Sequence, residues 1–230
     1  MSAKPAYDEA MQRFARFVVD HDEIVGTGGF LALRRMRLRN QRDDGSLSAR
    51  YTCDYVVRPY GQDAVIVVVW CRADDGTIAV LLRDGLRPPL YFGRQPAIAP
   101  LPEPAASPWS RELVAGILEV GDQGEAGLRH RACAEVAEEA GFEVSPAAVQ
   151  VLGAGAYPSP GGKIEKFYFT AVQVSASEQR ALPGDGSPME EGATTCWMPL
   201  DAAIAACVSG ELCDGKTELG LRRFRDTLTS

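Results

Sequence analysis

Apolar and polar positions along the first third of the chain mostly follow the short period of β-strands. A helix is expected before them, over residues 7–19, because Met11, Phe14, Ala15 and Val18 recur at helical spacing. Strands are then predicted over 30–38, 51–58, 64–70 and 77–83. Residues 65–69 form an unbroken β-branched run, which is typical of a central strand that is covered on both faces.

The pattern changes after residue 88. A proline-rich stretch over 88–108 predicts a long loop. A helix is expected next, with Asp122 and Glu125 as a capping box at its start and Gly141 just beyond its end. Its apolar face carries a residue at every fourth position, namely Leu128, Ala132, Val136 and Ala140. Further strands are predicted over 149–154, 165–174 and 194–198, and helices over 200–209 and 216–228.

Mixed strands with helices placed late indicate an α+β protein, built as an α/β/α sandwich around a mixed sheet. We expect residues 1–60 to form an N-terminal extension of one helix and antiparallel strands. Residues 61–230 are expected to form the main domain. No apolar run is long enough for a membrane span and no signal peptide is recognisable, so a cytoplasmic protein without a membrane partner is expected.

Charge and cysteine usage narrow the chemistry. A net charge of −7 argues against nucleic acid as the main partner. The one basic cluster, at Arg34, Arg35, Arg37 and Arg39, fits the solvated face of a strand better than a nucleic-acid patch. Six scattered cysteines without a CxxC pair, and only two histidines, argue against zinc and against a disulfide framework.

Three carboxylates lie close together on the expected central helix, at Glu135, Glu138 and Glu139. They repel one another unless something positive compensates them, and positions 135 and 139 are one helical turn apart. Oxygen ligands without Cys or His favour Mg²⁺ over zinc, with Mn²⁺ as the alternative. The competing interpretation is a solvated acidic helix face.

The context of these glutamates resembles the Nudix box. Residues 116–122 read Gly-Ile-Leu-Glu-Val-Gly-Asp, and residues 134–142 read Ala-Glu-Val-Ala-Glu-Glu-Ala-Gly-Phe. The family signature is Gly, five residues, Glu, seven residues, then Arg-Glu-apolar-x-Glu-Glu-x-Gly-apolar. Four further segments resemble the branch that acts on ADP-ribose and other nucleoside diphosphate sugars: Glu112-Leu-Val-Ala-Gly116, Arg87, Tyr157-Pro-Ser-Pro-Gly161 with Glu165, and Asp214-Gly-Lys-Thr217.

The resemblance implies a Nudix-type sandwich and a Mg²⁺-dependent pyrophosphohydrolase, with ADP-ribose cleaved to AMP and ribose 5-phosphate as the leading reaction. It also implies a homodimer that pairs through the N-terminal strands. The implied metal ligands are Glu135, Glu139 and the carbonyl of Ala115. The implied catalytic residues are Glu138 and Glu191, with Glu190 as the competitor of Glu191. The implied substrate contacts are Arg87, Glu112, Pro160, Gly161 and Glu165.

Three departures from the box stand beside the resemblance. Asp122 replaces the first glutamate, the spacing to Glu135 is longer, and Ala134 replaces the arginine. Because Arg131 precedes Glu135 by one helical turn, it is the candidate replacement for that arginine. Two other functions remain open: hydrolysis of another nucleotide, such as a nucleoside triphosphate or a dinucleoside polyphosphate, and nucleotide binding without catalysis.

Overall fold

The computed structural model describes residues 14–103, 107–182 and 186–228. The chain divides into two compact units. An N-terminal unit comprises Met1–Gln62 with Ser159–Glu165, and a main unit comprises Asp63–Pro158 with Lys166–Ser230. Residues 159–165, which the sequence places in the main domain, thus pack with the N-terminal unit.

The N-terminal unit is a three-stranded antiparallel sheet in the order β1–β2–β3. Its strands are β1 (Phe14–Val25), β2 (Ala32–Arg42) and β3 (Tyr51–Val57). The helix expected over 7–19 is wrong for residues 14–19, which belong to β1, and residues 7–13 lie outside the described part of the chain. The valines at 18 and 19 favour a strand, and pairing along nearly the whole of β2 overrides the helical spacing.

Three arginines of the basic cluster on β2 pair with aspartates of the neighbouring strands. Arg34 pairs with Asp22 of β1 and Arg35 with Asp54 of β3. These cross-strand ion pairs compensate the charges of Arg34 and Arg35 on the surface of the sheet itself.

The main unit contains a seven-stranded mixed sheet in the order β10–β5–β4–β9–β8, with β6 paired to β5 and β7 to β4. Its strands are β4 (Ala64–Arg72), β5 (Ile78–Leu86), β6 (Trp109–Glu112), β7 (Val114–Ile117), β8 (Gln150–Val151), β9 (Phe167–Gln173) and β10 (Thr194–Pro199). Its helices are α2 (Pro88–Gly93), α3 (Gly124–Glu135), α4 (Leu200–Ser209) and α5 (Gly215–Leu228). Short helical turns occupy Pro96–Ile98, Val136–Ala140, Pro146–Ala148, Ala176–Glu178 and Pro188–Glu190.

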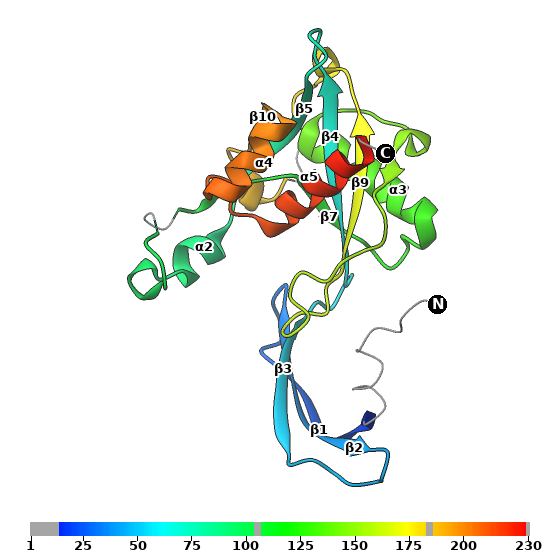
Figure 1. Cartoon of the computed structure of the whole chain (residues 1–230), viewed down its shortest axis with the longest axis vertical. Coiled ribbons are helices and arrows are strands. Elements are labelled where there is room, and N and C mark those ends of the chain that lie inside the picture. Colours follow the sequence, from blue (N-terminus) through cyan, green and yellow to red (C-terminus); the bar gives the residue numbers. More distant parts are fainter. Residues whose placement is uncertain (1–13, 104–106, 183–185, 229–230) are drawn as a thin grey trace, which may run out of the picture. The chain divides into compact units, whose positions relative to one another are not determined.

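Strand β4 lies at the centre of this sheet and is buried on both faces, as its β-branched run predicts. It runs parallel to β9 and antiparallel to β5 and β7. Ile66 and Val68 belong to the core cluster that includes residues of α4 and α5, and Val65 and Val67 belong to the cluster that includes residues of α3. The sheet therefore lies between helices on both faces, and the predicted α/β/α sandwich is confirmed (Figure 1).

Helix α3 packs on the sheet through the predicted face, whose members are all buried: Leu128, Ala132, Val136 and Ala140. Its last turn widens into a π-turn over Val136–Ala140, and Gly141 follows in the left-handed conformation at φ 74°. The expected capping box is wrong, because the N-cap residue is Gln123 and makes no side-chain cap. Asp122 instead accepts a hydrogen bond from the Glu119 amide.

The proline-rich stretch, expected as a long loop, contains two short helical segments within its described residues. It contains α2 and the turn Pro96–Ile98 before β6 begins at Trp109. Within the described residues, the helices are all too short or too polar to span a membrane.

Candidate active site

The clustered glutamates lie where the end of α3 meets strand β7. Glu135 is the last residue of α3, and Glu138 and Glu139 belong to the π-turn that follows. The Ala115 amide donates a hydrogen bond to Oε2 of Glu139, with an N···O distance of 3.0 Å. A Cβ at Gly116 would lie 1.8 Å from the carboxyl group of Glu135. Only glycine leaves room for that carboxyl group, which gives the box glycine a direct role here.

Arg83 of β5 completes this cluster from the sheet. Its side chain is 7% exposed, and its Nη1 lies 3.1 Å from Oε1 of Glu139. Its Nη2 donates to Oε1 of Glu190 at 2.8 Å. One guanidinium therefore joins a glutamate of the helix to a glutamate of the late loop.

Of the two loop glutamates, Glu190 pairs with Arg83. Glu190 is half-buried, whereas Glu191 is exposed. The carboxylate of Glu190 also acts electrostatically on both Glu135 and Glu139. Glu190 therefore occupies the position that the resemblance assigned to Glu191.

The pKa of Glu135 is strongly raised, although Arg131 lies 3.9 Å from its carboxyl group. Burial raises its pKa from 4.5 to about 8, and the neighbouring charges of Glu139 and Glu138 add to the shift. Burial also raises the pKa of Glu139, although Arg83 and the Ala115 amide oppose it. A buried group of carboxylates whose pKa values rise in this way is a site of negative potential that a cation would relieve.

A second charged network lies beside this cluster and contains two of the predicted substrate contacts. Arg87 donates to both oxygens of Glu112, from Nε at 2.9 Å and from Nη2 at 2.8 Å. Lys216, at the start of α5, pairs with Glu112 and with Asp214. Burial alone would raise the pKa of Glu112, but Lys216 and Arg87 outweigh it and hold the value at about 2. Arg87 is thus oriented by Glu112 while remaining partly open to solvent.

The other predicted substrate contacts lie in the N-terminal unit. Pro160 and Gly161 are exposed, and Glu165 forms an ion pair with Arg58. Both members of this pair are nearly buried and belong to the same unit.

The oxygen atoms of the clustered glutamates are suitable ligands for a hard divalent cation. The available groups are carboxylate oxygens, which Mg²⁺ and Mn²⁺ prefer, and the pKa of Glu135 is raised because burial and the neighbouring glutamates outweigh Arg131. In the arrangement described, however, no three His, Cys, Asp or Glu side chains come close enough together to form a metal cage. Residues that would hold a cation are therefore Glu135 and Glu139, with Glu138 and Glu190 nearby.

Comparisons with known proteins bear on this arrangement. No family model matches the chain. It is 25% identical to an ADP-ribose pyrophosphatase of Haemophilus influenzae over 178 residues, which cover 76% of this chain and 72% of that protein. It is 39% identical to a GDP-mannose pyrophosphatase of Citrobacter koseri over 108 residues, 47% of this chain and 51% of that protein.

The crystal structure of an ADP compounds hydrolase superposes with a TM-score of 0.64 at 14% identity, covering 94% of this chain and 96% of that one. The chain has the Nudix fold. A NUDIX hydrolase from Alicyclobacillus acidocaldarius also aligns, over 70% of this chain and 89% of its own, with a TM-score of 0.45. The resemblance found in the sequence is thus confirmed.

Ala134 stands in place of the motif's arginine, and Arg131, the predicted replacement, makes the longest of its three ion pairs with Glu135. Arg131 pairs with Asp122 at 2.8 Å and with Glu119 at 2.9 Å. Its distance to Oε1 of Glu135 is 3.9 Å. Arg131 therefore chiefly braces the loop that enters α3, with a weaker contact to the glutamate.

Sequence reasoning missed Arg83, although a signal was present. An arginine within the apolar run of β5, directly after the buried Leu81 and Leu82, is unusual for a strand interior. The Nudix box itself offered no reason to look there.

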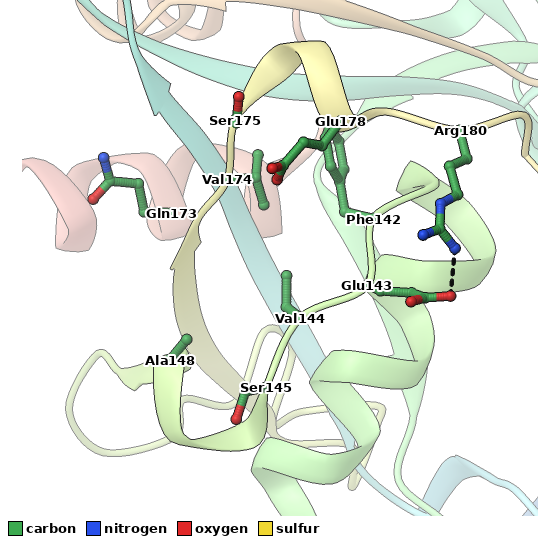
Figure 2. Close-up of a pocket in the computed structure, with 10 residues that line it drawn as sticks. All are labelled: Phe142, Glu143, Val144, Ser145, Ala148, Gln173, Val174, Ser175, Glu178 and Arg180. Carbon is green, nitrogen blue, oxygen red and sulfur yellow. Dashed lines mark hydrogen bonds and ion pairs between the residues drawn. The ribbon is translucent and has the colours of Figure 1, made fainter.

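One cleft of the Nudix domain lies away from the predicted site. It encloses about 790 Å³ between segments 142–148 and 173–180, and Glu143 and Arg180 form an ion pair in it (Figure 2). None of the residues predicted for metal, substrate or catalysis lines it. The cleft is therefore separate from the glutamate cluster.

Proposed function

We propose that this protein hydrolyses the diphosphate bond of nucleoside diphosphate sugars with the help of divalent metal ions. The observation that carries the proposal is the meeting of Glu139 and Glu190 on Arg83, directly beside Glu135. The names of the two curated relatives, an ADP-ribose pyrophosphatase and a GDP-mannose pyrophosphatase, agree with this substrate class.

Each residue has a distinct part in the proposed reaction. Glu135 and Glu139 would hold the cation, with Glu138 beside them and the carbonyl of Ala115 as a further oxygen ligand. When bound, the cation offsets the charge of the diphosphate and lowers the pKa of a bound water. Glu190 would accept the proton of the attacking water, because it approaches the cluster from the opposite segment.

Substrate orientation is assigned to a second set of residues. Arg87 would contact a phosphate oxygen, since a planar guanidinium suits phosphate and Glu112 fixes its direction. Pro160, Gly161 and Glu165 are proposed to contact the sugar or base.

The finer assignment is ADP-ribose as substrate, Mg²⁺ as the physiological ion and a homodimer formed through the N-terminal strands. The relative that matches 76% of this chain supports the first part, because it is named an ADP-ribose pyrophosphatase. The chemistry of the carboxylate donors supports the second.

A substrate panel tests the proposal. Purified protein is incubated with Mg²⁺ or Mn²⁺ and with ADP-ribose, GDP-mannose, UDP-glucose, NADH, a dinucleoside polyphosphate and the nucleoside triphosphates, and products are separated by chromatography. AMP with ribose 5-phosphate is the expected product pair. Turnover of triphosphates or the dinucleoside polyphosphate alone would reassign the substrate class, and binding without turnover would make the protein a nucleotide-binding module.

A further inference from the structure

The motif's arginine, which would restrain the glutamates, is absent at Ala134, and Arg83 of β5 contacts the same cluster from the sheet. Ala134 cannot pair with a carboxylate, and Arg131 makes its two shortest ion pairs with Asp122 and Glu119. Another residue must therefore orient the side chain of Glu139, which belongs to the π-turn at the end of α3.

The geometry around Arg83 is that of a clamp. Its Nη1 lies 3.1 Å from Glu139, and its Nη2 lies 2.8 Å from Glu190. The second oxygen of Glu139 accepts the Ala115 amide at 3.0 Å. Both oxygens of Glu139 are thereby fixed in direction, each from a different strand of the sheet.

Room for the clamp comes from Gly85. A Cβ at this position would lie 3.1 Å from Nη1 of Arg83. Gly85 lies two residues along β5 and on the same face of the strand, so its missing side chain leaves the guanidinium free to reach the glutamates.

Stability alone does not explain a buried arginine at this position. Its Nε is buried and has no hydrogen-bond partner among the residues that the structure describes. Replacing a buried ion pair by packed apolar residues is often neutral or stabilising. A buried arginine with an unpaired nitrogen therefore points to a role other than stability.

We propose that Arg83 is the positioning residue of this site, orienting Glu139 and Glu190 in place of the box arginine. The inference rests on the proposed function, because it takes Glu139 as a metal ligand. Two carboxylates on separate segments need two donor nitrogens in a fixed fork, which lysine does not have.

Measuring metal affinity distinguishes a positioning role of Arg83 from a purely electrostatic one, because removing Arg83 changes the affinity in opposite directions in the two cases. Arg83→Met removes a positive charge next to Glu139, so a purely electrostatic role predicts tighter cation binding. A positioning role predicts weaker binding, by roughly 10- to 100-fold. Arg83→Lys keeps the charge but contacts one carboxylate at a time, and is expected to bind about tenfold more weakly than wild type.

The experiment is a calorimetric titration of each full-length variant with Mn²⁺ in the absence of substrate. Arg111→Met is the matched control, since Arg111 pairs bidentately with Asp84 across β5 and β6 without touching the glutamates. Its Mn²⁺ affinity is expected to stay within about threefold of wild type. Circular dichroism checks folding, and the test rests on Arg83→Lys if Arg83→Met unfolds.

Kinetics supply the second readout. Under saturating metal, loss of orientation should lower kcat while KM for the nucleotide sugar changes little. Tighter Mn²⁺ binding by Arg83→Met, or wild-type behaviour of Arg83→Lys, would overturn the positioning role. Failure of the wild type itself to bind Mn²⁺ would overturn the proposed function along with it, so the two failures are distinguishable.

Discussion

Replacing Glu135 by glutamine should stabilise the metal-free protein, and the gain should grow with pH. The carboxyl group has a pKa of about 8 in the folded chain and an ordinary value of 4.5. The folded state therefore binds more protons than the unfolded state between these values, so the stability of the wild type falls as pH rises from about 4.5 to 8. Glutamine has the same shape but no charge to bury.

The size of the effect follows from the shift. A displacement from 4.5 to about 8 corresponds to roughly 4 to 5 kcal/mol at alkaline pH. The side chain of Glu135 retains 12% exposure, and the surroundings relax, so we expect about half of that, roughly 2 kcal/mol. For a chain of this length, such a gain raises Tm by roughly 4 to 8 °C.

Thermal unfolding of wild type and Glu135→Gln at about pH 5 and pH 8.5, in a chelating buffer, measures this gain in stability. Glu125→Gln is the control, because Glu125 lies on the same helix but is exposed and paired with Arg129; its effect should stay within about 0.5 kcal/mol. Saturating Mg²⁺ should reverse the order, since only the wild type gains binding energy. An advantage of Glu135→Gln that is equal at both pH values, or a loss of stability at pH 8.5, refutes the reasoning.

Further outcomes are expected at neighbouring positions. Gly116→Ala should weaken Mg²⁺ activation roughly 10- to 100-fold, because its Cβ would lie 1.8 Å from the Glu135 carboxyl group; Gly121→Ala, with no atom within 4 Å of its Cβ, should leave activation unchanged in the same titration. Arg131→Ala should lower the free energy of unfolding by about 1 kcal/mol, because the ion pair with Asp122 is lost. It should change Mg²⁺ affinity less than threefold, and a large loss of affinity would restore the predicted role of Arg131 at Glu135. Apparent Mg²⁺ affinity should rise with pH by up to about tenfold per unit below pH 8, as protons compete for Glu135, and a flat profile by calorimetry would contradict this.

Local pattern alone predicted much of the main unit. The period of Leu128 and its partners identified the buried face of α3, and the β-branched run at 65–69 identified the central strand. Such periodicities report which side of an element avoids water, and that property is encoded within a few residues. The motif likewise predicted that Glu135 and Glu139 lie close together, since their spacing is set by one helical segment, and both meet strand β7.

Contacts between distant segments were decided by the tertiary structure. Residues 14–19 carry a pattern compatible with a helix, and only pairing with β2 makes them a strand. The family resemblance favoured Glu191 over Glu190, but the turn Pro188–Glu190 directs Glu190 to Arg83. Arg83 becomes part of the site because β5 passes beside the end of α3, and no local pattern records which remote carboxylate a buried arginine will meet.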